Sequence, residues 1–75
     1  MNGSTKPVTY INPPKECDIC HGPFVEDIMF DAATCHGPWA NMCMHCFNQI
    51  GVGLGTGLGQ QYRKNSSGTW VKIAG

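Results

Sequence analysis

The feature that most constrains the fold of this chain is a pair of CxxC motifs. The first runs from Cys17 to Cys20 and the second from Cys43 to Cys46, with 22 residues between them. Two cysteines at this spacing lie on one tight turn, and two such turns offer four sulfur ligands, the set that suits tetrahedral zinc. The intervening segment slightly exceeds the usual length of roughly 15–20 residues. We therefore predict that these four cysteines bind one structural Zn²⁺ ion.

The size of the chain makes such a cross-link necessary. Its 75 residues allow one domain. Below roughly 70–80 residues a single apolar core seldom supplies more than about 3–5 kcal/mol, so a metal or disulfide is expected. The odd count of five cysteines and the absence of an apolar signal segment near Met1 argue against disulfides. We expect a zinc protein of a reducing cytoplasm.

Composition divides the chain into three predicted parts. Residues 1–16 are expected to form a flexible N-terminal arm, within which 8–11 also fit one short strand. Residues 17–50 are predicted to be the zinc-binding core. Residues 51–75 hold a glycine-rich tract and a hairpin that packs on this core, because an isolated two-stranded hairpin is only marginally stable.

The predicted fold class is a small, metal-stabilised, β-rich α+β domain. Cys17–Pro23 forms a first metal-binding turn, and the apolar runs within 24–30 fit a hairpin arm. The second CxxC leads into residues 47–50, which fit one helical turn ended by Gly51. This order favours a treble-clef-like core, and a zinc ribbon with a second strand at this place is the alternative.

Glycine occupies every odd position from 51 to 59. A strand with this pattern would have one bare face, and its other face would carry Val52, Leu54, Thr56 and Leu58. A flexible linker is the alternative, although interleaved leucines are unusual in a solvated spacer. A phosphate-binding loop is not indicated, because neither G-x-G-x-x-G nor Gly-Lys-Ser/Thr occurs.

The last residues predict a β-hairpin with strands at 61–64 and 69–73 and a turn at 65–68. Its aromatic and basic side chains are candidates for a surface that stacks on bases and contacts phosphates. These possible partner-binding residues are Tyr62, Arg63, Lys64, Trp70 and Lys72. The other interpretation places the aromatic rings in the core and leaves the cations in solvent.

Charge is unevenly distributed along the chain. All five acidic residues precede residue 32, and only three basic residues follow it. Four thiolates and one dication leave −2 at the metal site, so the loaded protein is mildly acidic. Proteins that depend on phosphate contacts are normally more basic, which weakens the nucleic-acid hypothesis.

A second cysteine–histidine motif leaves the ligand set open. The segment 20–24 (CHGPF) is echoed by 35–39 (CHGPW), so Cys35 or His36 could replace a ligand or form a second site. The two-residue spacing favours Cys43 and Cys46, which predicts Cys35 as a small buried apolar side chain. Residues 17–21 also match the haem-attachment pattern CxxCH, but that assignment leaves the second CxxC without a purpose.

The run 37–47 (GPWANMCMHCF), continued by 51–62 (GVGLGTGLGQQY), resembles small zinc-finger-like proteins encoded by tailed bacteriophages. In that group a CxxC precedes a Gly-Pro-Trp segment, a second CxxC and a glycine-alternating tract that ends near a tyrosine. The resemblance covers about residues 17–62 and implies that the same four cysteines are the ligands. It implies a phage origin and the cytoplasm of an infected bacterial host, and it supplies no activity.

The predicted function is that of a non-enzymatic, zinc-binding phage module that contacts a macromolecule. Nucleic acid is one candidate partner, bound through the basic and aromatic hairpin. A host or phage protein, for example in transcription or replication, is the other, and a structural accessory of a larger assembly is a third. A closed four-thiolate shell, with no nucleophile–base pair elsewhere, indicates no catalysis. Neither a membrane nor a small-molecule substrate is expected.

Overall fold

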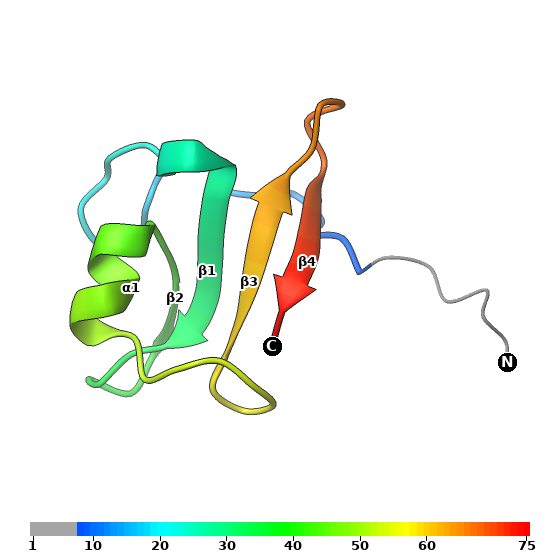
Figure 1. Cartoon of the computed structure of the whole chain (residues 1–75). Helices are drawn as coiled ribbons and strands as arrows, with labels where there is room; N and C mark the ends of the chain where they lie inside the picture. Colours follow the sequence, from blue (N-terminus) through cyan, green and yellow to red (C-terminus); the bar gives the residue numbers. More distant parts are fainter. Residues whose placement is uncertain (1–7) are drawn as a thin grey trace, which may run out of the picture.

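The computed structural model describes residues 8–75 and arranges them around one antiparallel sheet (Figure 1). The sheet has four strands in the order β2-β1-β3-β4. One helix follows β2, and one 3-10 turn precedes β1. The elements are η1 (Val25–Asp27), β1 (Ile28–Ala33), β2 (Trp39–Met42), α1 (Met44–Ile50), β3 (Gly59–Lys64) and β4 (Trp70–Ala74). The predicted small β-rich domain with one helix is confirmed.

Strand β1 lies in the middle of the sheet because it carries apolar side chains on both of its faces. Ile28, Met29 and Phe30 are all buried, and β1 pairs with β2 on one side and β3 on the other. The β1–β2 turn closes when the Thr34 hydroxyl donates to the Pro38 carbonyl at 2.8 Å. This hairpin delivers the end of β2 directly to the second CxxC.

The helix covers one face of the sheet and is longer than the single turn predicted for 47–50. It begins after Cys43 and runs to Ile50, since Met44, His45 and Cys46 of the second CxxC motif already adopt helical geometry. The Phe47 ring stacks on Phe30 with centroids 4.0 Å apart and planes at 7°. Gly51 ends the helix where a Cβ atom would lie 2.4 Å from the Phe47 ring.

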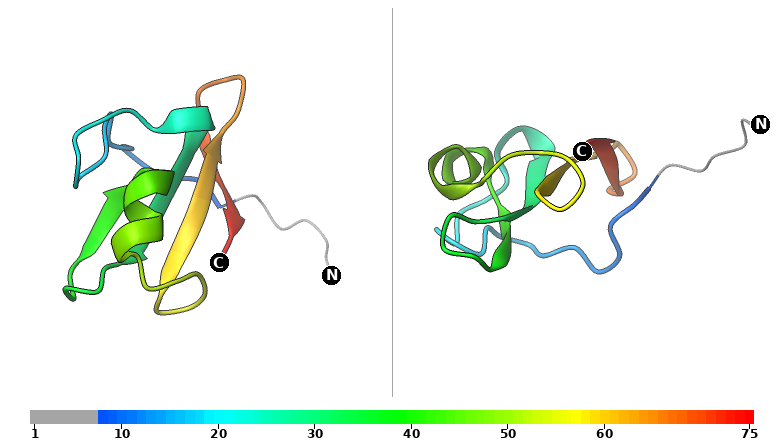
Figure 2. Two further views of the ribbon diagram at one scale, coloured as in Figure 1. Left: turned by 60° about the vertical axis from the view of Figure 1, so that its left-hand side comes forward. Right: turned by 90° about the horizontal axis from the view of Figure 1, so that it is seen from below.

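The opposite face is covered by the segment that precedes the first CxxC, as the right-hand view of Figure 2 shows. Tyr10 packs edge-on against Tyr62, with centroids 5.3 Å apart. Phe24 packs in the same way against Trp70 at 5.5 Å. With the fully buried Met29, these rings form a second small core.

Part of the predicted N-terminal arm is paired with the sheet. Thr9 forms an isolated antiparallel bridge with Val71 on the outer edge of β4. The Tyr10 N–H donates to the Trp70 carbonyl at 3.0 Å, and the Lys72 N–H donates to the Val8 carbonyl at 2.8 Å. The strand suggested by 8–11 is therefore present as a single bridge. Residues 1–7 of the predicted arm lie outside the described residues.

The C-terminal hairpin is present as predicted. β3 and β4 pair antiparallel, with an irregularity between Gln61 and Tyr62. The turn is held by the Asn65 side-chain oxygen, which accepts bonds from the Ser67 and Thr69 N–H groups, both at 3.0 Å. Asn and Ser are typical of such turns because their side chains bond to nearby backbone groups.

The glycine tract is neither a strand nor a free linker. Gly53, Gly55 and Gly57 have φ angles of 141°, 125° and 80°, which a regular strand does not allow. Two backbone hydrogen bonds tie the tract to Ala33 on β1. The Val52 N–H donates to the Ala33 carbonyl at 3.1 Å, and the Ala33 N–H donates to the Leu58 carbonyl at 2.9 Å. The tract is thus an irregular loop fixed against the sheet.

Within residues 8–75, α1 is the single α-helix, and no helix is long and apolar enough to cross a bilayer.

Candidate metal centre

The structure brings the four cysteines of the two CxxC motifs into one cluster. Their sulfur atoms all lie within 4.8 Å of one another, and those of Cys20 and Cys43 are 3.8 Å apart. A tetrahedral zinc with Zn–S bonds of about 2.3 Å requires sulfurs about 3.8 Å apart. The cluster therefore has the size and donor set of a tetrahedral thiolate site. Cys17, Cys43 and Cys46 are buried, whereas Cys20 is exposed.

The first CxxC is a tight turn whose backbone faces the sulfur atoms. The Cys17 N–H donates to the Gly22 carbonyl at 2.9 Å, which closes the turn. The Ile19 and Gly22 N–H groups point at the sulfurs of Cys17 and Cys20, each at 3.4 Å. Such donors stabilise a thiolate, as a metal ligand requires.

The second CxxC lies at the start of α1. Cys43 is the residue before the helix and makes no side-chain capping bond, so its sulfur is available to the cluster. Cys46, one turn later, faces the same interior. The two motifs are held together by Asp18, whose carboxylate accepts from the Asn41 N–H and whose own N–H donates to the Asn41 carbonyl, both at 2.8 Å.

The thiols differ in their tendency to ionise. Burial, with the neighbouring thiols, raises the pKa of Cys46 to about 12. Burial also raises the pKa of Cys43. For Cys17 burial acts in the same direction, but backbone N–H donors outweigh it and bring its pKa to about 7. A metal that binds here must displace protons, so its affinity falls as pH falls.

The other candidate ligands lie elsewhere. Cys35 and His36 are exposed at the β1–β2 turn, so the prediction that Cys35 is buried is wrong. Backbone bonds between Thr34 and Pro38 and between Gly37 and Thr34 close this turn at the surface, where residues 35–39 are all exposed. The His21 ring bonds to Glu16 at 2.9 Å, and His45 is exposed on α1. None of the three histidines belongs to the cluster found within residues 8–75, and all five cysteines are free.

The predicted stacking surface on the hairpin needs a correction. Tyr62 and Trp70 are only 4% and 6% exposed and lie in the core. Their rings are covered because Tyr10 and Phe24, distant in sequence, pack on that face. The structure therefore favours the other interpretation, in which the aromatic side chains are structural.

The three basic residues of the hairpin do not all lie on one face of the sheet. Arg63 is exposed and pairs with Val71, which places it on the opposite face of the sheet from Tyr62. Lys64 lies 3.6 Å from Asp27 and 5.7 Å from the centre of the Trp70 ring. Lys72 is half-buried on the face of Tyr62.

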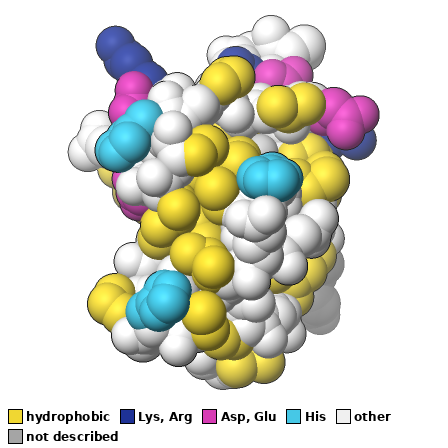
Figure 3. All heavy atoms as spheres, turned by 90° about the vertical axis from the view of Figure 1, so that its left-hand side faces the viewer, with side chains coloured by type: hydrophobic (Ala, Val, Ile, Leu, Met, Phe, Trp, Pro, Cys, Tyr) yellow, Lys and Arg dark blue, Asp and Glu magenta, His cyan; other side chains and the backbone are white. Residues whose placement is uncertain are grey.

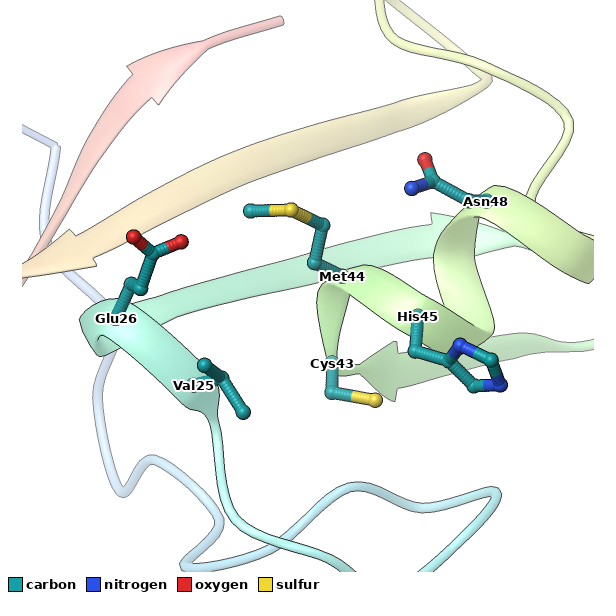
Figure 4. A pocket seen from close by; sticks show the side chains of 6 residues that line it. All are labelled: Val25, Glu26, Cys43, Met44, His45 and Asn48. Carbon is teal, nitrogen blue, oxygen red and sulfur yellow. The ribbon is translucent and has the colours of Figure 1, made fainter.

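A pocket of about 270 Å³ that the sequence did not predict lies beside the cluster, between η1 and α1 (Figure 4). Its lining residues are Val25, Glu26, Cys43, Met44, His45 and Asn48. Glu26 and Asp27 have φ angles of 58° and 57°, which non-glycine residues rarely adopt. No sequence pattern predicts two consecutive non-glycine residues with positive φ, so the sequence did not predict the pocket.

One carboxyl group outside the cluster provides a test of the electrostatics. Burial, and secondarily Asp18, raises the pKa of Asp31 above its ordinary value. The folded state then holds the proton more tightly than the unfolded state, so stability is lost as pH rises through the ordinary and then the raised pKa.

We expect Asp31→Asn to raise the Tm of the metal-loaded protein at about pH 7, with a smaller gain at lower pH. A lower Tm at neutral pH, measured by circular dichroism, would contradict this.

In the comparisons with known proteins, no family model, curated protein or solved structure matches the chain.

Proposed function

We propose that this chain is a non-enzymatic module whose fold depends on one structural Zn²⁺ ion. The observation that supports this is the closed cluster of four sulfurs, with its two CxxC turns and a sulfur–sulfur distance of 3.8 Å. Four thiolates fill a tetrahedral zinc shell and leave no position for a reactive water. The order of turn, hairpin, CxxC and helix supports a treble-clef-like core over a zinc ribbon.

Metal content tests this proposal directly. Native mass spectrometry of the protein is expected to show one zinc ion per chain. The Co²⁺-substituted protein is expected to absorb as a tetrahedral thiolate complex, because cobalt reports the geometry that zinc adopts. Cys35→Ser should leave both results unchanged, since that thiol lies outside the cluster. Two ions per chain, or none, would contradict the proposal.

For the macromolecular partner, a protein is better supported than nucleic acid. No charged residue occurs between Asp31 and Arg63 in the sequence. Four exposed apolar side chains belong to that run, and we call them the uncharged surface: Trp39, Val52, Leu54 and Leu58. In Figure 3 the Lys, Arg, Asp and Glu side chains gather at the upper end, and the lower half carries hydrophobic, histidine and other side chains. Exposed apolar side chains that lie together in one patch typically mark protein contacts.

The proposed setting is the cytoplasm of an infected bacterial host, which follows from the resemblance to the phage group. The uncharged surface lies around Ala33: this residue pairs with Trp39 and bonds through its backbone to Val52 and Leu58. A host or phage protein with a matching apolar surface is the partner that these residues support.

Nucleic acid binding is expected to be weak and nonspecific. With Tyr62 and Trp70 buried, the hairpin offers no stacking platform, and its remaining cations are few. Titration of labelled single- and double-stranded DNA across a salt series should give only weak, sequence-independent binding near physiological ionic strength. Tight binding that falls steeply with salt, and that Arg63→Ala with Lys64→Ala weakens, would favour the nucleic-acid function instead.

A further inference from the structure

The pocket beside the metal cluster combines apolar walls with an acidic edge. In Figure 4 Met44 extends from the first turn of α1 toward η1, and Val25 points from η1 toward the helix. Val25 is 59% exposed, so its side chain is accessible to a ligand that enters the pocket. The walls are thus suited to an aliphatic chain, whose burial would remove these groups from water.

The edge of the pocket carries one carboxylate that is free to bind a cation. Glu26 makes no ion pair among residues 8–75, because Lys64 lies beside the adjacent Asp27 instead. The backbone of η1 holds Glu26 at the pocket in the left-handed conformation. Asn48 adds a side-chain amide on the helix side, and Cys43 connects the pocket to the cluster.

The loaded metal site adds to this negative charge. Four thiolates and one dication carry a net charge of −2, and Cys43 belongs both to that site and to the pocket wall. No Lys or Arg lines the pocket. This step depends on the proposed structural zinc.

We propose that this pocket receives an arginine side chain from the protein partner. The aliphatic stem of arginine would lie along Val25 and Met44, as long cationic side chains do on apolar surface. Its guanidinium is a planar fork of donors, so it can bond to both oxygens of the Glu26 carboxylate. Lysine offers a single, more strongly hydrated point charge and fits this arrangement less well.

The experiment uses zinc-loaded protein and capped amino acids as probes. N-acetyl-arginine methylamide is titrated while the methyl resonances of Val25 and Met44 are followed by ¹H–¹³C NMR at about pH 8, where an ordinary imidazole is neutral. The matched probe is the citrulline compound, which has the same shape without the charge. We expect saturable shifts of both methyl groups with arginine and much weaker binding of citrulline.

Two variants separate the carboxylate from general electrostatics. Glu26→Gln is expected to weaken arginine binding by about two- to fivefold, the range for an exposed ion pair. Glu16→Gln, which removes an equal charge at the residue that bonds to His21, should leave the affinity unchanged. Equal affinity for arginine and citrulline, or no effect of Glu26→Gln, would overturn the inference. If the zinc-loaded protein gives no saturable shift, this inference fails while the proposed metal module stands; if the protein takes up no zinc, the proposed function itself fails.

Discussion

Removal of zinc is expected to unfold the chain completely. The described core consists of two small clusters, and three of the five residues in the larger one are cysteines of the metal site. Structural zinc contributes an apparent binding free energy of roughly 10–16 kcal/mol that is coupled to folding, far more than so small an apolar core supplies. A strong chelator should therefore abolish the dispersed ¹H NMR spectrum, and added zinc should restore it.

Single cysteine variants sharpen this expectation. Cys46→Ser is expected to abolish tight zinc binding and ordered structure, because Cys46 is buried within the cluster. Cys35→Ser is the matched control, since it removes an exposed thiol from the β1–β2 turn. A metal-free protein that keeps a cooperative unfolding transition, or a Cys35→Ser variant that loses zinc, would contradict the assignment.

The pH dependence of zinc-coupled stability has a definite sign. Because the pKa of Cys46 is raised to about 12, chiefly by burial, its proton must leave when metal binds. Acidification returns protons to the thiols and so favours metal release. The zinc-dependent part of the stability should fall as pH falls.

The second large effect is expected at Gly59, where three segments meet. A Cβ atom at this position would lie 2.5 Å from the Ala32 Cβ and 2.6 Å from the Gly53 carbonyl oxygen. Neither neighbour is the end of a flexible side chain, so β1 or the glycine tract must move. We expect Gly59→Ala to lower the free energy of unfolding by about 3 kcal/mol, the upper range for overpacking.

Gly57→Ala separates crowding from backbone strain. Gly57 has a φ of 80°, and its Cβ would meet nothing within 4 Å. Its substitution should cost only the strain of a left-handed residue, about 1–2 kcal/mol. Urea denaturation of the zinc-loaded variants measures both values. Equal losses for the two variants would show that crowding at Gly59 is unimportant.

The contrast between these glycines shows what the alternating pattern could not reveal. The period of two predicted either a strand with one bare face or a linker. In the structure the reason for glycine differs at each position: Gly59 lies against Ala32, whereas Gly55 and Gly57 adopt positive φ in open space. Both reasons depend on how the chain folds back onto β1, which is not a property of local spacing.

The sequence alone determined the four cysteines that can share one ion, because a two-residue spacing fixes a pair of sulfurs on one turn whatever surrounds them. It also determined the C-terminal hairpin, since alternating side chains and a polar turn act locally. Tertiary structure decided which side chains remain accessible. Tyr62 is buried against Tyr10 and Trp70 against Phe24, and in each pair the two rings are more than 40 residues apart in the chain. Burial depends on such distant contacts, which the sequence does not reveal. For this reason the predicted stacking surface on the hairpin is absent from the structure, and the pocket at Glu26 was not predicted.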